Sequence, residues 1–150
     1  MNKQLALQSL RNAKSAHLQW RARAQALVAG VELDESSVPM LHTDCKFGQW
    51  YYGPGQDLAS IPTFRAIATP HELLHAVYMK IFKALHGKDS RSALQKLFGK
   101  KVDFDAKRLA EAKSYMDELV DVSRTLLEMI EQLEKEIKEM DDAELEALSR

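Results

Sequence analysis

Four side chains that can bind a transition metal lie between residues 17 and 75, namely His17, Cys45, His71 and His75. His71 and His75 are four residues apart, so on a helix they lie one turn apart on the same face and can both reach one ion. Three imidazoles and one thiolate form a closed tetrahedral ligand set, which suits borderline-soft Zn²⁺ best. The residue types and their spacing therefore predict a zinc site.

Each of these residues has a simpler explanation when it is considered alone. A single core histidine is usually hydrogen-bonded, and a lone cysteine usually behaves as a small hydrophobic residue. Together the four favour a metal site, because buried polar groups on separate segments need a shared partner to offset their burial. His42 is an alternative ligand, since a helix would present it beside Cys45. We prefer His17, which lies in the apolar seam of the first predicted helix.

The residues 71–75 also spell HELLH, the HExxH signature in which a glutamate activates water on an open zinc position. Three observations argue against a hydrolase. Glu72 is predicted to close a capping box with Thr69, the downstream ligands of such enzymes do not follow, and Cys45 and His17 would fill the coordination sphere. We therefore expect no enzymatic activity and no catalytic residues.

The composition favours helices, because Ala, Leu, Lys, Glu and Gln are frequent while Val, Ile and Thr are sparse. No alternating pattern requires a strand. The fold class that we predict is all-α, an antiparallel four-helix bundle with short accessory helices and a long C-terminal helix. The predicted helices span residues 3–29, 38–52 (capped by Ser36 or Ser37), 69–86, 90–98 and from 103 or 105 to 140.

The last predicted helix carries four heptads of apolar positions, and its stripe narrows toward the C-terminus. In the narrow part, Ile130, Leu133 and Ile137 have no obvious partner inside a compact bundle. We therefore expect a homodimer that pairs these residues. The domain division that follows is a zinc-binding bundle over residues 1–128 and an acidic helical extension over 129–150 that continues the last bundle helix.

The chain has 150 residues and a net charge of −1, but its charges are unevenly distributed. Residues 1–31 carry five basic side chains and no acidic one, while residues 128–150 carry nine acidic and three basic ones. We expect the basic helix either to pack near the acidic helix or to be simply solvated, and not to bind nucleic acid. No apolar run is long enough to span a bilayer and no signal peptide is recognisable. The single cysteine favours a reducing, cytoplasmic location without a membrane partner.

Three short blocks carry a resemblance to a known family: H-L-Q-W from His17, C-K-F-G-Q-W from Cys45 and H-E-L-L-H from His71. Their order and gaps resemble the chemoreceptor zinc-binding (CZB) domain, whose pattern is H-x-x-W, C-x-[LF]-G-x-W and H-x-x-x-H. The resemblance covers roughly residues 3–128. It implies a zinc site of three histidines and one cysteine in a helical bundle, and it supports His17 over His42.

The same resemblance implies a regulatory module. Such domains are usually attached to soluble chemoreceptors or diguanylate cyclases, are often dimeric, and respond to zinc or to oxidants such as hypochlorous acid at the cysteine. No signalling tip or cyclase domain follows in the given residues, so we expect the regulated output to lie on another chain or on a truncated part. The alternative is a structural or zinc-buffering helical protein.

Two further residue types have a physical role in this interpretation. Gly48 is predicted to lie on the same helical face as Cys45, where the missing side chain lets a neighbouring helix approach the metal. Trp20 and Trp50 are predicted to pack around the site and keep water away from it.

Overall fold

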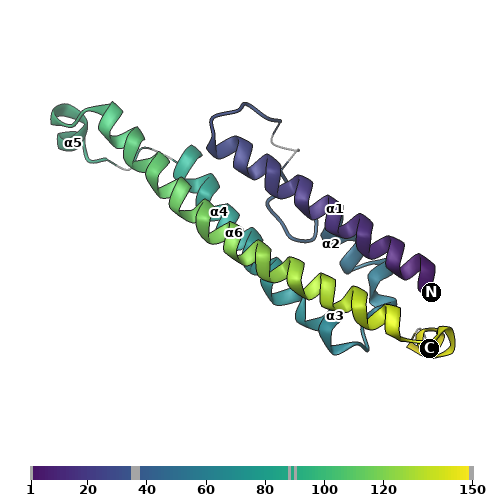
Figure 1. The fold of residues 1–150 in the computed structure, drawn as a ribbon. Coiled ribbons are helices and arrows are strands. Elements are labelled where there is room, and N and C mark those ends of the chain that lie inside the picture. The colour runs from purple at the N-terminus through teal and green to yellow at the C-terminus, as the bar shows by residue number, and fades with distance from the viewer. Residues whose placement is uncertain (1, 35–37, 88, 90, 149–150) are drawn as a thin grey trace.

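The computed structural model describes residues 2–34, 38–87, 89 and 91–148, and these residues form helices and connecting loops without a strand. Three helices are long (Figure 1): α1 (Lys3–Val28), α4 (Ala68–His86) and α6 (Lys101–Glu139). The remaining elements are short, and they are α2 (Lys46–Tyr51), the 3₁₀-helix η2 (Pro54–Leu58), α3 (Pro62–Ala66), α5 (Ala93–Phe98) and α7 (Asp142–Leu148).

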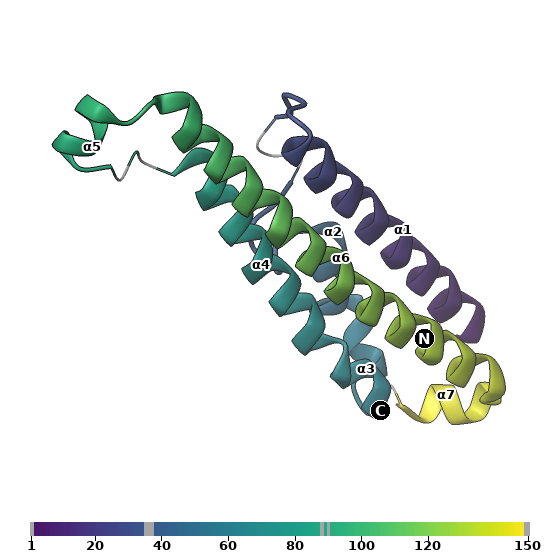
Figure 2. The same cartoon turned by 60° about the vertical axis from the view of Figure 1, so that its left-hand side comes forward.

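The helix α6 lies along both other long helices (Figures 1 and 2). Lys3 Nζ at the start of α1 donates to Met140 O just beyond the end of α6, at 2.7 Å. Arg108 Nε near the start of α6 donates to Ala84 O near the end of α4, at 2.8 Å. Both α1 and α4 therefore run opposite to α6. The four-helix arrangement is not confirmed, because the segment between α1 and α4 forms only short helices.

The first helix was predicted to within one residue at its end. Asn2 caps α1 by accepting the Leu5 N–H at 2.8 Å, and the helix ends before Gly30, whose φ of +89° favours glycine. The side chains that face the core include Leu10, His17 and Trp20. His17 thus lies in the buried seam where the apolar periodicity placed it.

The prediction of a helix over residues 38–52 was wrong in its first half. The helix α2 begins only at Lys46, and Cys45 is its N-cap, with extended backbone (φ −70°, ψ 151°) and a sulfur that accepts the Gly48 N–H. A side chain that accepts this bond starts a helix and does not continue one. The predicted caps Ser36 and Ser37 lie outside the described residues.

The predicted start of the helix that corresponds to α4 was also wrong. The helix α4 follows α3 almost without a break, since Ile67 between them keeps helical backbone (φ −65°, ψ −29°), and Ile67 makes no side-chain cap. Thr69 lies inside the helix and Pro70 in its first turn, where proline is tolerated. Glu72 closes no capping box, and its carboxylate accepts the Tyr52 hydroxyl at 3.1 Å.

The accessory helix near residue 95 starts later than predicted and the long helix starts earlier. Ser92 caps α5 in a capping box with Gln95, and Gly99 ends it as predicted. The predicted start at Ser90 lies outside the described residues. The helix α6 already begins at Lys101.

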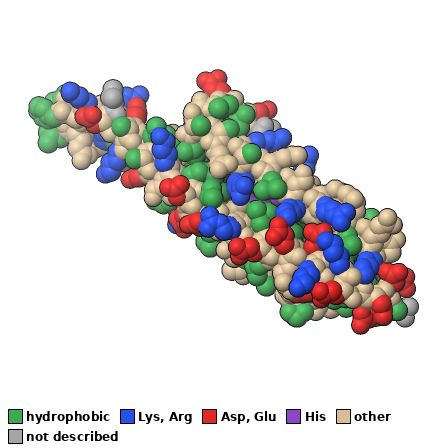
Figure 3. All heavy atoms as spheres, in the orientation of Figure 1, with side chains coloured by type: hydrophobic (Ala, Val, Ile, Leu, Met, Phe, Trp, Pro, Cys, Tyr) green, Lys and Arg blue, Asp and Glu red, His purple; other side chains and the backbone are tan. Residues whose placement is uncertain are grey.

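The basic side of α1 packs against acidic residues of α6, as predicted from the charge distribution. Lys14 pairs with Glu131, and Arg11 Nε lies 3.5 Å from Glu134 Oε1. Figure 3 shows basic and acidic side chains mixed along this part of the surface. Within the described part of the chain, no helix is both long enough and apolar enough to cross a bilayer.

The apolar residues expected to pair in a homodimer already have partners within one chain. Ile130, Leu133 and Ile137 are fully buried within the single chain. The helix α6 ends at Glu139, extended backbone at Met140 (ψ 148°) changes the chain direction, and α7 folds back and buries Leu145 (Figure 2). Residues 140–148 therefore do not continue α6, and the apolar seam is covered without a second copy.

This burial makes a measurable prediction. Leu133→Ala removes a fully buried side chain and leaves a cavity, so we expect the free energy of unfolding to fall by about 2–5 kcal/mol. Leu94→Ala is the matched control, because Leu94 on α5 is 69% exposed and its truncation should change stability by less than about 0.5 kcal/mol. Chemical denaturation measures both. Equal effects of the two substitutions would contradict the assigned seam.

Candidate metal centre

The structure brings Cys45, His71 and His75 into one buried cluster. One ligand atom of each residue lies within 4.8 Å of the other two, and Cys45 Sγ is 3.3 Å from His71 Nε2. Ligand atoms of a tetrahedral zinc site lie about 3.3–3.8 Å apart, given zinc–nitrogen and zinc–sulfur bonds of ordinary length. The three ligand atoms therefore suit one zinc ion, if the longest distances between them shorten slightly when the ion binds.

The orientation of His75 is set by the segment that precedes α2. His75 Nδ1 donates to the backbone carbonyl of Met40 at 2.8 Å, which leaves Nε2 as the nitrogen available to a metal. The same segment is tied to α1, because Trp20 Nε1 donates to Pro39 O at 3.1 Å. Two adjacent carbonyls thus join the loop to α4 and to α1.

The ring of His71 is oriented by packing. Its Nε2 faces the sulfur of Cys45, and its ring centroid lies 4.6 Å from that of Phe47. Its Nδ1 is buried and has no hydrogen-bond partner in the described structure. The two histidines of α4 are therefore oriented differently, since a backbone carbonyl holds His75 and the ring of Phe47 packs on His71.

The position of Cys45 depends on a close backbone crossing at Gly48. A Cβ atom on Gly48 would lie 1.7 Å from His42 O. The missing side chain of Gly48 predicts a close approach here, although by a neighbouring helix. The backbone that approaches is the turn before Cys45, and it directs the thiol toward α4 while Gly48 N–H donates to the sulfur at 3.2 Å.

Burial sets the protonation state of the cluster. It lowers the pKa of His71 to about 3 and that of His75 to about 4, so both rings are neutral at pH 7, which is the form that binds metals. Burial raises the pKa of the Cys45 thiol, and the Gly48 N–H offsets this only in part. Metal binding must therefore displace the thiol proton.

His17 lies beside the cluster but outside it. It is buried, burial lowers its pKa to about 4, and its ring centroid is 6.3 Å from that of Phe47. His17 Nε2 is hydrogen-bonded to Ser123 Oγ at 2.8 Å, and neither ring nitrogen belongs to the group within 4.8 Å. Three of the four predicted ligands are thus together, and His17 as the fourth stays a prediction.

The alternative ligand His42 also lies outside the cluster. Its ring centroid is 6.1 Å from that of His71 and 6.4 Å from that of His75. The helix that would have presented His42 beside Cys45 does not form. The backbone carbonyl of His42 instead accepts a hydrogen bond from the Cys45 thiol at 3.5 Å.

Aromatic rings cover the cluster. Trp20 packs on His75 with ring centroids 4.6 Å apart, as the predicted packing role requires. Trp50 lies one layer further out, in contact with Phe47 and Phe64. The Met40 carbonyl and the Ser123 hydroxyl are two functional groups near the site that were not predicted from the sequence. A serine in an apolar heptad was the available signal for Ser123, whereas a backbone carbonyl in a loop leaves no signal.

Glu72 is oriented away from hydrolytic chemistry. Its side chain is 53% exposed, and its Oε1 atom accepts the Tyr52 hydroxyl and lies 4.0 Å from His42 Nε2. The capping box that argued against a hydrolase is absent, but these contacts hold the carboxylate outside the buried cluster.

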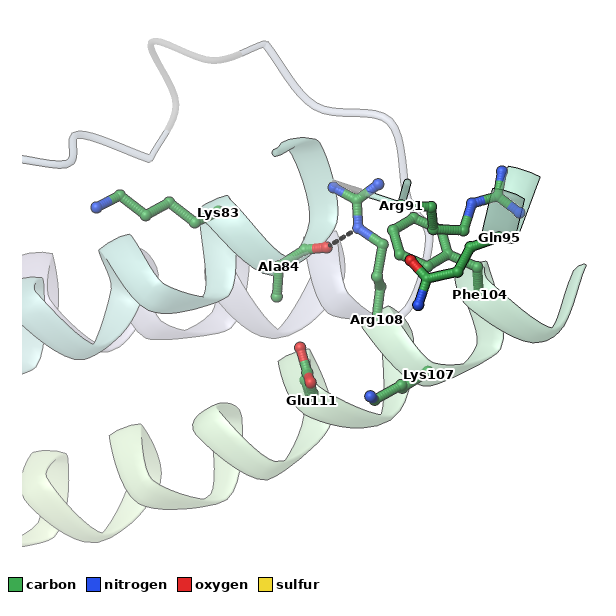
Figure 4. A pocket seen from close by; sticks show the side chains of 8 residues that line it. All are labelled: Lys83, Ala84, Arg91, Gln95, Phe104, Lys107, Arg108 and Glu111. Carbon is green, nitrogen blue, oxygen red and sulfur yellow. Dashed lines mark hydrogen bonds between the residues drawn. The ribbon is translucent and has the colours of Figure 1, made fainter. Parts of the chain in front are cut away.

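A second, polar hollow of about 370 Å³ lies where α4, α5 and α6 meet (Figure 4). Arg108 donates to the carbonyls of Ala84 and Gly87 at the end of α4, and Arg91 pairs with Asp89. Figure 4 shows the amine of Lys83 pointing away from the hollow. The amine of Lys83 and the guanidinium groups of Arg91 and Arg108 therefore do not converge on one point in the hollow.

Comparison with known families agrees with the buried cluster. Residues 17–82 match the family model of the chemoreceptor zinc-binding domain, a range that includes all four predicted ligands. No curated protein and no solved structure matches the chain.

The crossing at Gly48 gives a prediction for the site. Gly48→Ala should lower the free energy of unfolding by about 1–3 kcal/mol, because the new Cβ must displace the His42 backbone. The same displacement moves Cys45, so zinc affinity should fall by about 10- to 100-fold. Gly30→Ala is the control, because it strains a left-handed residue far from the cluster with nothing within 4 Å. A zinc titration should find unchanged affinity in this control, and an equal loss in both variants would contradict the local explanation.

Proposed function

We propose that the chain is a zinc-binding sensor module that regulates a bacterial signalling protein of the chemotaxis or cyclic-di-GMP type. The observation that carries the proposal is the buried cluster of Cys45, His71 and His75 within a chemoreceptor zinc-binding domain. One thiolate and neutral imidazoles form the ligand set that zinc prefers, and His17 is the proposed fourth ligand. The bound ion would link the turn that contains Cys45 to α4, because both segments supply ligands.

Elemental analysis and ligand substitution test the metal assignment. Protein purified without chelator should contain close to one zinc per chain. His71→Ala and His17→Ala should weaken zinc binding by orders of magnitude, because each removes a ligand from a closed set.

His42→Ala should barely change the affinity and serves as the matched control, since His42 is a neighbouring histidine outside the cluster. Competition with a chromogenic chelator measures all three variants. Retention of zinc by His71→Ala would contradict the site itself, and loss in His42→Ala without loss in His17→Ala would replace the fourth ligand.

We further propose that oxidants act on the module through Cys45. A hollow of about 230 Å³ between α1 and α2 has Cys45 in its wall, together with Trp20, Arg23 and Lys46. Arg23 and Lys46 in this wall favour the approach of small anions such as hypochlorite, and Asp44 in the same wall opposes it. Reaction of hypochlorous acid with the thiolate gives the sulfenic acid and chloride, and the sulfenic acid is a poorer zinc ligand. With one cysteine in the chain, reversal needs an external thiol.

Metal release under oxidation tests this role. One equivalent of hypochlorous acid should release zinc from the wild-type protein faster than from a Cys45→Asp variant that still holds zinc. A carboxylate can bind the ion but cannot form a sulfenic acid. A chromogenic chelator follows the release. Equal rates in the two proteins would show that Cys45 is not the trigger.

A structural zinc site is the second candidate function. It is favoured by the complete burial of the three ligand residues in the core between the 38–45 segment and α4. A structural site holds zinc tightly and exchanges it slowly, whereas a sensor exchanges it near the free cellular level. The measured zinc affinity therefore separates the two functions.

The regulated partner and the homodimer are also part of the proposal. A chemoreceptor or diguanylate cyclase on another chain is the partner class that the family implies. The homodimer no longer has support from Ile130, Leu133 and Ile137, which are buried inside one chain. Light scattering at micromolar concentration decides the oligomeric state.

A further inference from the structure

Ser123 is an unusual residue in the seam of α6. The buried positions on both sides of it are apolar, with Leu119 before it and Leu126 after it, while Ser123 itself is fully buried. A buried hydroxyl needs hydrogen-bond partners. Ser123 Oγ has two of them, His17 Nε2 at 2.8 Å and Arg21 Nη1 at 3.2 Å. Both partners come from α1, so this hydroxyl joins the two helices inside the core.

The bond to Ser123 holds His17 away from the metal cluster. A ring nitrogen has one in-plane direction for either a hydrogen bond or a metal. His17 Nε2 is directed at Ser123, and neither nitrogen of the ring is among the clustered ligand atoms. The ring must therefore turn before it can reach an ion between Cys45, His71 and His75.

We propose that Ser123 and the zinc ion compete for Nε2 of His17. This inference rests on the proposed zinc site and adds its regulation. When the three-residue cluster takes up zinc, His17 leaves Ser123 to become the fourth ligand. The hydroxyl keeps a partner after this exchange, because Arg21 still donates to it. Ser123 is thus a positioning residue, because its hydrogen bond keeps the fourth ligand, His17, away from the cluster until zinc binds.

The exchange would connect the metal to the longest helix. Ser123 lies within α6, and His17 is the link from α1 to that position. Zinc binding removes this link and replaces it with one between α1 and the cluster. The packing of α1 on α6 would therefore depend on metal occupancy, although α6 itself supplies no ligand.

Zinc affinity of a Ser123→Ala variant tests the competition. Removal of the competing hydroxyl should raise zinc affinity about fivefold, the ratio that corresponds to one neutral hydrogen bond. Alanine suits both the helix and the apolar seam, so the variant should fold. Ser114→Ala is the matched control, because Ser114 is an exposed serine of the same helix, and its affinity should equal that of the wild type. A lower or unchanged affinity in Ser123→Ala overturns the inference.

A double-mutant cycle assigns the effect to His17. In a His17→Ala background, Ser123→Ala should no longer change zinc affinity, because the contested nitrogen is gone. A persistent effect would overturn the competition. Loss of zinc binding in His71→Ala, measured in parallel, shows that the site itself stands, so failure of this inference is distinguishable from failure of the proposed function.

Nitrogen NMR of protein with ¹⁵N-labelled histidine gives a readout that does not depend on affinity. The imidazole shifts of His17 identify which ring nitrogen binds zinc. We expect Nε2 to be the bound nitrogen in the zinc-loaded protein. Zinc at Nδ1, with Nε2 still protonated and bonded to Ser123, would overturn the proposal.

Discussion

The hydrogen bond from Gly48 N–H to Cys45 Sγ is the contact on which the rest of the site depends. It makes Cys45 the N-cap of α2, so the irregular segment before α2 ends at this residue. That segment can then cross over Gly48, which is possible only because Gly48 has no side chain. The crossing directs the sulfur toward His71 and brings the Met40 carbonyl to His75. One backbone turn therefore positions the thiol and orients a histidine of another helix.

The parts of this fold that the sequence predicted are those set by local rules. Apolar periodicity placed His17 in the seam of α1, and Gly30 marked its end because a left-handed residue favours glycine. The pair His71 and His75 shares a helix face by spacing alone. The start of α4 was misjudged because the Thr69-Pro70 pattern resembles a cap, whereas Ile67 carries the helical path on from α3.

The parts that could not be predicted depend on contacts between distant residues or on the backbone. His17 and Ser123 are separated by 106 positions, and no local pattern relates them. Cysteine as an N-cap is indistinguishable in sequence from cysteine inside a helix. The apolar residues at the end of α6 looked unpartnered because nothing in their own spacing indicates that α7 folds back and that the start of α1 lies beside them. In each case the missing information was tertiary.

The indole of Trp20 also places an optical reporter at the centre of the protein. Its ring lies 4.6 Å from that of His75, while its Nε1–H is held by the Pro39 carbonyl. Indole emission responds to the charge of a neighbouring imidazole and to the polarity around it. Because the ring is locked in place by that bond, changes in its emission arise from its surroundings and not from its own rotation. The emission of Trp20 can therefore report the state of His75 without an added label.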